Sequence, residues 1–191
     1  MTIGTTGYTT LSRPFALDLS DLPAGVTAYY ASAVGASWVT LTETTAKVAA
    51  GTGLILKGTP GANYTIPVAK QSEAETLSGN LLVGCTVRQS VATDENKYVM
   101  VNNGGTAEFQ NLSTSPATVP AGKAFLSVPV LGGGAKARLS FFFESSDATA
   151  IETIPAADAL NDAPAYNLQG QRVDKAYKGI IIQKGKKYLA K

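Results

Sequence analysis

The feature that most limits the possible folds of this chain is a two-residue alternation of apolar and polar side chains, repeated in short runs. In the segment WVTLT, Val39 and Leu41 fall on one side, whereas Trp38, Thr40 and Thr42 fall on the other. Such alternation is typical of a β-strand with one buried and one exposed face. Similar runs occupy residues 15–19, 27–33, 53–57, 64–68, 81–83, 98–101, 123–128 and 139–143.

Turn-forming residues separate these runs, as in GTPG at residues 58–61 and NNGG at residues 102–105. The phrases LPAGVTAYYA, VAAGTGLILK and VPAGKAFLSV each place a glycine just before a strand-like run, which predicts one tight turn used three times. Strands at this spacing, without long helical periods between them, favour an antiparallel sandwich or barrel over a parallel βαβ sheet. We therefore predict an all-β chain whose residues 1–145 form an antiparallel β-sandwich of the jelly-roll or immunoglobulin-like type.

Only residues 70–77, KQSEAETL, have helical character. Ser72 and Glu75 fit a capping box, in which each side chain bonds a free amide at the start of a helix. We expect one or two helical turns here, in a connection between strands.

Composition excludes several chemistries. The chain has no histidine, so no Ser/His or Cys/His nucleophile pair and no ordinary zinc site can form. The single cysteine, Cys85, lies in the apolar run LLVGCTV and is predicted to be a buried core residue rather than a reactive thiol. We predict a non-catalytic protein without cofactor or metal. A hydrolase using Asp18 with Asp21, or Glu144 with Asp147, is an outlying alternative.

Trp38 is the candidate ligand-binding residue, because its own alternation places a large apolar ring on the exposed threonine face. Tyr29 and Tyr30 point to opposite faces of a neighbouring run, so one of them can join it. The cover for the indole is the protein itself, a contacting module or a stacked sugar ring. These three alternatives stay open at the level of sequence.

The C-terminal end differs from the rest in charge and pattern. Residues 146–165 are small and polar with two prolines, which predicts a linker. Residues 166–191 then predict two hairpins, residues 166–168 with 172–173 and residues 179–183 with 186–190. Against one acid, Asp174, the basic residues of this tail are Arg172, Lys175, Lys178, Lys184, Lys186, Lys187 and Lys191. We expect no nucleic-acid partner, since the domain as a whole is not strongly basic, and no transmembrane segment, since no run approaches ~20 apolar residues.

Several of these segments together resemble a known group of proteins. The segments TIGTTGYTTLSRPFALDLS, VAAGTGLILKGTPGANYTIPVA, VPAGKAFLSVP and ARLSFFFE resemble a β-rich module common near the C-termini of secreted and surface proteins of Bacteroidetes. The ending YNLQGQRV followed by KGIIIQKGKK is similar to the type A C-terminal sorting domain read by the type IX secretion system. The residues that carry the second likeness are Tyr166, Asn167, Leu168, Gly170, Gln171, Arg172, Val173, Lys178, Gly179, Gly185, Lys186 and Lys187.

The resemblance implies a location and a role. It implies a secreted or cell-surface protein whose native chain continues upstream of Met1 towards a signal peptide. The chain would then be a non-catalytic structural or adhesive accessory module at the C-terminal end, with the upstream domains, the secretion machinery and a glycan as candidate partners. A carbohydrate-binding module using exposed aromatic rings is the alternative function. Because only the last two hairpins of a sorting domain match, the tail either acts as a signal or completes the fold.

Overall fold

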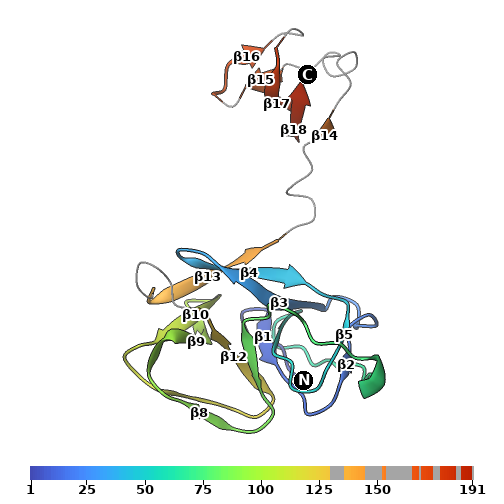
Figure 1. The fold of residues 1–191 in the computed structure, drawn as a ribbon, viewed down its shortest axis with the longest axis vertical. Coiled ribbons are helices and arrows are strands. Elements are labelled where there is room, and N and C mark those ends of the chain that lie inside the picture. The colour runs from blue at the N-terminus through green and yellow to red at the C-terminus, as the bar shows by residue number, and fades with distance from the viewer. Residues whose placement is uncertain are drawn as a thin grey trace. The chain divides into compact units, whose positions relative to one another are not determined.

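The computed structural model describes residues 1–129, 136–144, 152–153, 165–167, 169–173, 177–183 and 186–190. The chain forms two compact units, Met1–Glu144 and Ser145–Lys191, which we call the body and the tail. In the described residues both are built from strands, and the predicted all-β fold of the β-sandwich type is confirmed (Figure 1). None of the helices in these residues has the length and apolar character needed to span a membrane.

The body contains a nine-stranded sheet in the order β1-β6-β3-β4-β13-β10-β9-β12-β7. A pair of short ribbons, β2 with β5 and β8 with β11, flanks this sheet. The strands of the body are β1 (Tyr8–Leu11), β2 (Leu17–Asp18), β3 (Thr27–Val34), β4 (Trp38–Glu43), β5 (Lys47–Val48), β6 (Leu54–Lys57), β7 (Leu82–Cys85), β8 (Gln89–Val91), β9 (Asp94–Asn103), β10 (Thr106–Leu112), β11 (Ala117–Val119), β12 (Lys123–Ser127) and β13 (Arg138–Phe143).

Strand β13 joins the two halves of the sheet. One half, β1-β6-β3-β4, comes from the first third of the chain, and the other, β10-β9-β12-β7, comes from the middle. β13 pairs antiparallel with β10 but parallel with β4, where Ser140 lies opposite Trp38 and Phe142 opposite Thr40. The sheet is therefore mixed, unlike the wholly antiparallel arrangement that we expected, because the last strand fills a gap between two hairpins instead of extending an edge.

The two ends of the sheet approach each other, so that the body is nearly barrel-like. The Ser12 N–H donates to the Gly122 carbonyl at 3.0 Å, and the Ala124 N–H donates to Thr10 Oγ1 at 3.2 Å. An isolated bridge between Thr52 and Val83 adds a further link. Closure of this kind covers strand edges that would otherwise offer unpaired backbone groups to another chain.

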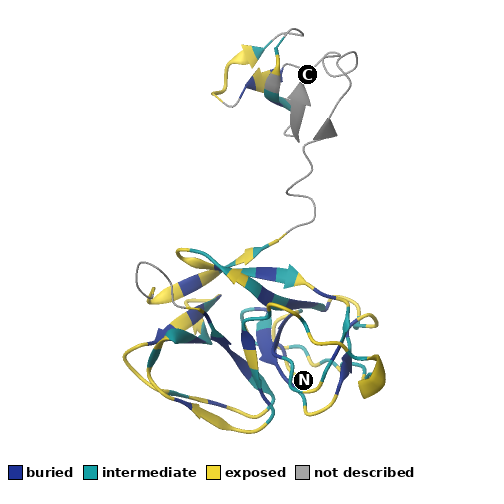
Figure 2. Cartoon of the chain, viewed as in Figure 1, coloured by how far each residue is buried: buried dark blue, intermediate teal, exposed yellow. Residues whose placement is uncertain are grey.

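Three apolar clusters fill the body. Figure 2 shows buried and exposed positions alternating along its strands. The central cluster contains Val39, Leu41, Phe109 and Leu139, all fully buried, and the others lie under the β2–β5 and β8–β11 ribbons. Cys85 belongs to the third cluster and is 2% exposed, which confirms the predicted core role. Burial also raises the pKa of its thiol, so that the unreactive protonated form is favoured.

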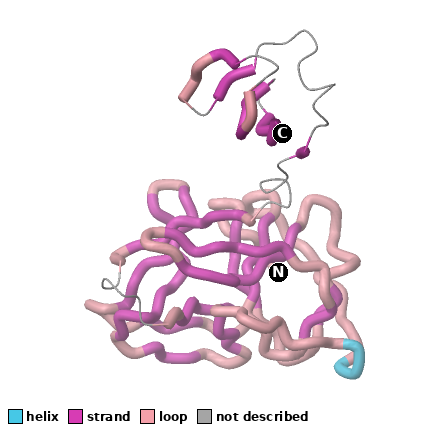
Figure 3. The backbone as a smooth tube through the Cα atoms, turned by 45° about the horizontal axis from the view of Figure 1, so that its top comes forward, coloured by secondary structure: helices cyan, strands magenta, loops and turns pink. Residues whose placement is uncertain are grey.

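Of the one or two helical turns expected within residues 70–77 a single 3₁₀ turn is present, and the predicted capping box is wrong. The structure has one 3₁₀ turn, Gln71–Glu73, preceded by Lys70, and no side chain caps it (Figure 3). Glu75 is drawn into strand-like pairing instead, since its N–H donates to the Lys47 carbonyl at 2.8 Å and its carbonyl accepts from Ala49 at 3.0 Å. The helical turn therefore ends at Glu73, and Ala74 is already extended.

The recurring glycine turn is present at all three places. Gly25, Gly51 and Gly122 have φ angles of 81°, 82° and 80°, a region that side chains disfavour. Gly51 and Gly122 lie where the sheet closes, and their N–H groups donate to the carbonyls of Arg13 and Cys85. The shared phrase thus encodes one backbone shape, and two of its three copies help to close the sheet.

The tail contains a small five-stranded sheet in the order β14-β18-β17-β15-β16. Its strands are β14 (Glu152–Thr153), β15 (Ala165–Asn167), β16 (Arg172–Val173), β17 (Gly179–Gln183) and β18 (Lys186–Ala190). Both predicted hairpins are present: Tyr166 pairs with Arg172, and Gly179 pairs with Ala190. Most of the predicted linker, residues 146–165, lies outside the described residues.

Candidate functional site

The three aromatic residues predicted as a ligand site do not lie together. Tyr29 is only 9% exposed and packs in the central cluster, with its ring centroid 5.2 Å from that of Phe143. Burial raises the pKa of its phenol, with the Glu43 carboxylate as a further cause. Tyr30 is half-buried on the other side of β3, opposite Thr42. The structure therefore places Tyr30 on the face of Trp38 and leaves Tyr29 inside.

Trp38 lies at the start of β4 and is 43% exposed. Its ring lies against the backbone of Gly35, so closely that an added Cβ at Gly35 would collide with the indole. The Gly35 N–H also donates to the Trp38 carbonyl at 2.8 Å, which closes the β3–β4 turn. One side of the ring is thus covered by its own hairpin, and the rest is open to solvent.

Sequence reasoning missed a second exposed aromatic residue, Phe142, which is 54% exposed. Phe141 and Phe143 point inwards, and their ring centroids lie 5.4 and 6.0 Å from that of Tyr8. Because side chains alternate along a strand, Phe142 between them points outwards. Alternation within FFFE could have shown this orientation. It could not have shown that Phe142 lies beside Thr40, since the β4–β13 pairing joins segments about a hundred residues apart.

Together these residues form a surface that we call the outer aromatic face: Tyr30, Trp38, Thr40, Thr42, Ser140, Phe142 and Glu144. They lie in rows across β3, β4 and β13, with Trp38 beside Ser140 and Thr40 beside Phe142. The Thr42 hydroxyl donates to Glu144 Oε2 at 2.7 Å and lies 2.8 Å from Ser32 Oγ. Diagonal neighbours on adjacent strands are about 7–8 Å apart, so Trp38 and Phe142 can contact one ligand together.

In the tail, Asn167 organises the sequence motif from inside. It is 6% exposed, and its Oδ1 accepts from the N–H groups of Gln169 at 3.0 Å and Gln171 at 2.9 Å. Its Nδ2 donates to Gln171 Oε1 at 3.0 Å, and Gly170 turns the chain with a φ of 79°. Asn167, Gly170 and Gln171 therefore have a structural task, namely to hold the β15–β16 turn.

Other motif residues face solvent. Tyr166 is 40% exposed, and Arg172 and Lys178 are exposed too. Strand pairing sets Arg172 beside Tyr166 and Tyr166 beside Ile182 across β16, β15 and β17. Val173 is half-buried, Gly179 begins β17 and Lys186 begins β18, whereas Leu168 and Gly185 lie outside the described residues. The motif thus divides into residues that form the turn and residues that a partner can touch.

One acid of each pair considered for hydrolysis, Asp18 and Glu144, makes local hydrogen bonds. Asp18 Oδ1 accepts from the hydroxyl of Ser20 at 2.5 Å and from its N–H at 3.0 Å, and these bonds, followed by Lys47, lower the pKa of Asp18. Glu144 accepts from Thr42, and Asp147 lies outside the described residues. In the described part of the chain, no three His, Cys, Asp or Glu side chains gather as metal ligands would.

Comparison with known proteins gives no relative from which a role can be transferred. No family model, no curated protein and no solved structure matches the chain. Roles for the outer aromatic face and for exposed Tyr166 and Arg172 of the tail must therefore come from their own chemistry and geometry.

Proposed function

We propose that the chain is a non-catalytic accessory module of a secreted or cell-surface protein, and that the outer aromatic face is its contact surface. One observation carries this proposal: Trp38 and Phe142 expose 43% and 54% of their surface on one face of paired strands. Exposed apolar area costs about 25 cal/mol per Å² relative to its burial. Large rings held together on a rigid sheet are therefore typical of an interaction surface.

The first candidate partner is an upstream domain of the same native chain. A photo-crosslinking amino acid at position 142 of the full-length native protein should give an intramolecular crosslink to the upstream domain. The same residue at position 15 is the matched control, because Phe15 is also 43% exposed but lies outside the outer aromatic face. Equal crosslinking from both positions would count against a specific contact.

Export through the tail is the second part of the proposal. It is supported by the likeness of residues 166–191 to type IX sorting domains and by the exposed row of Arg172 and Tyr166. A reporter fused to residues 150–191, in a host with that secretion system, should reach the cell surface or the medium. Arg172→Glu should block its export, since the turn around Asn167 does not use Arg172. Periplasmic retention of the unchanged fusion would refute a working signal.

Carbohydrate binding is a second candidate function, favoured by the mixture of groups on the outer aromatic face. Rings of Trp38 and Phe142 can stack on the apolar faces of sugars, and Thr40, Thr42 and Glu144 offer hydroxyl and carboxylate groups next to them. This combination is typical of shallow polysaccharide sites rather than of buried cavities.

Affinity electrophoresis and a glycan array test this candidate. Trp38→Ala and Phe142→Ala should each weaken retention by about tenfold or more, if each ring contributes about 1.5 kcal/mol of stacking. Phe15→Ala, which removes a ring of similar exposure elsewhere, should leave retention unchanged. If the unchanged protein binds no glycan, the carbohydrate function is eliminated while the contact with an upstream domain stands.

A further inference from the structure

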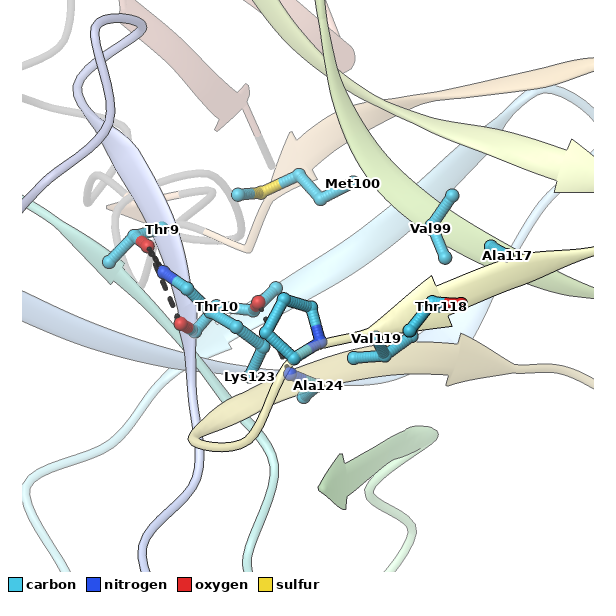
Figure 4. A pocket seen from close by; sticks show the side chains of 10 residues that line it. Thr9, Thr10, Val99, Met100, Ala117, Thr118, Val119, Lys123 and Ala124 are labelled. Carbon is cyan, nitrogen blue, oxygen red and sulfur yellow. Dashed lines mark hydrogen bonds between the residues drawn. The ribbon is translucent and has the colours of Figure 1, made fainter. Parts of the chain in front are cut away.

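A pocket opens where the closing edge of β1 meets β12, on residues that the outer aromatic face does not include. Its volume is about 340 Å³, within the range of small-molecule sites. Val99, Met100, Ala117 and Val119 supply apolar wall, and Thr9, Thr10 and Lys123 supply polar groups (Figure 4). A second hollow of about 240 Å³ shares these three polar residues and continues towards Arg13.

Lys123 is the unusual group of this pocket. Its Nζ donates to Thr9 Oγ1 at 2.6 Å, which uses one of three N–H groups. Burial lowers the pKa of this ammonium, and the nearby Arg13 guanidinium lowers it further. Lys47, Lys70 and Lys97 each have a carboxylate within 4 Å, but among the described residues Lys123 has none.

An ammonium held in this way is an incomplete ion pair. Removal of a charge from water is unfavourable unless an opposite charge or several hydrogen bonds replace the water. The single bond to Thr9 replaces it only in part, and Arg13 does not compensate because it is also positive. Arg13 Nη1 donates to the carbonyls of Ser12 at 3.1 Å and Gly122 at 3.5 Å.

Sheet closure alone does not account for the lysine. Two hydrogen bonds already join the strand ends here, from the Ser12 N–H to the Gly122 carbonyl and from the Ala124 N–H to the Thr10 hydroxyl. A neutral side chain at position 123 could bond Thr9 without the cost of a half-buried charge. The positive charge is therefore better explained by an anionic ligand than by the fold.

We propose that this pocket binds a small organic carboxylate, whose carboxyl group pairs with Lys123 Nζ. The Thr9 hydroxyl lies beside the ammonium, Thr10 also lines the pocket, and the apolar body of the ligand lies against Met100, Val99 and Val119. A purely inorganic anion fits less well, because half of the lining offers it no hydrogen bond. Binding supplies the counter-ion that Lys123 lacks and removes apolar area from water.

The two methionines of the chain make a direct test possible. With methyl-¹³C methionine the full chain gives two methyl signals, from Met100 in the pocket and from Met1 beside the second hollow. Titration with benzoate and hexanoate should shift the Met100 signal to saturation. The uncharged amides, benzamide and hexanamide, should have an affinity at least about tenfold lower. The indole N–H of Trp38, the single tryptophan, should stay unchanged.

Variants locate the charge that is required. Lys123→Met should reduce benzoate affinity by about tenfold or more, since a charge-assisted bond is lost. Lys97→Met is the matched control, because Lys97 is a partly exposed lysine already paired with Asp94 at 3.1 Å. The Lys97→Met variant should bind benzoate as tightly as the unchanged chain does. Equal binding of benzoate and benzamide, or equal binding by Lys123→Met, would overturn the proposal.

Two further outcomes are decisive as well. If sulfate displaces benzoate at equal concentration, the pocket is a general anion site and the organic ligand is refuted. If Lys123→Met does not fold, the comparison of each acid with its amide on the unchanged chain decides, and so does the position of the shifted methyl signal.

Discussion

The body and the tail are both built from β-sheets, but different kinds of contact stabilise each of them. In the body, the central cluster joins residues as distant in sequence as Leu41 and Leu139, both fully buried. In the described part of the tail, the most connected buried side chain is polar: Asn167 makes three side-chain hydrogen bonds, all to residues no more than four positions away. The body thus depends on distant apolar contacts and the tail turn on local polar ones.

The two units are therefore sensitive to different kinds of substitution. A cavity in the body affects strands from both halves of the sheet at once, because they share one core. Loss of a polar group in the tail affects a turn of five residues and leaves its donors without partners.

Phe109→Ala should be the most damaging change. Phe109 is fully buried, and its ring centroid lies 5.6 Å from that of Phe141. Loss of such a ring lowers the free energy of unfolding by about 3–5 kcal/mol, which urea unfolding followed by Trp38 fluorescence will measure. Phe142→Ala is the control, and it should change the value by no more than about 0.5 kcal/mol because Phe142 faces solvent. Similar losses for both would contradict the assignment of faces on β13.

Gly84→Ala should be the next most damaging change. An added Cβ on Gly84 would collide with the Gly51 carbonyl and the Ser12 side chain, where the sheet closes. Overpacking of this kind costs about 1–3 kcal/mol in unfolding free energy, since the Gly51 backbone cannot move aside without breaking its bond to Arg13. Ser12→Ala alone should be nearly neutral, because the buried Ser12 Oγ has no partner among the described residues. A neutral Gly84→Ala would mean that the sheet ends are further apart than described.

Sequence alternation predicted part of the body well, and its failures have physical causes. It located β3, β4, β6, β12 and β13 to within a residue or two. It missed β10, because Asn111 occupies a buried position where alternation expects an apolar residue. Asn111 can be buried there because its Nδ2 donates to the Glu95 carbonyl at 2.8 Å. It wrongly predicted a strand at residues 64–68, where Pro67 lacks the N–H that a ladder needs and only Val68 forms a bridge, to Leu17.

The candidate surfaces were predictable only where they depend on one strand. The exposure of Trp38 follows from alternation within β4. The partnership of Trp38 with Phe142 depends on a parallel pairing that no local pattern encodes, and the Lys123 pocket depends on the meeting of β1 and β12. Tyr29 illustrates the same limit, since alternation separates it from Tyr30 but does not say which of the two faces is the core.

Asn167→Ala tests the polar side of the contrast. Removal of the amide leaves the N–H groups of Gln169 and Gln171 without their acceptor, which should cost the tail turn about 1–2 kcal/mol. Hydrogen exchange at these two amides should therefore become about 5- to 30-fold faster. Gln169→Ala is the control, because Gln169 is exposed and contributes only its backbone to the turn. Unchanged exchange in Asn167→Ala would show that apolar contacts, not Asn167, hold the turn.

Tyr98→Phe should have the smallest effect and the opposite sign. Tyr98 is fully buried in the central cluster, and its hydroxyl has no hydrogen-bond partner among the described residues. Removal of an unsatisfied buried hydroxyl should leave the unfolding free energy unchanged or raise it by up to about 1 kcal/mol. Tyr98→Ala, by contrast, should cost about 3–5 kcal/mol, because it removes the ring as well. If Tyr98→Phe instead destabilises the body by more than about 1 kcal/mol, its hydroxyl has a partner, and the body depends on polar contacts as the tail does.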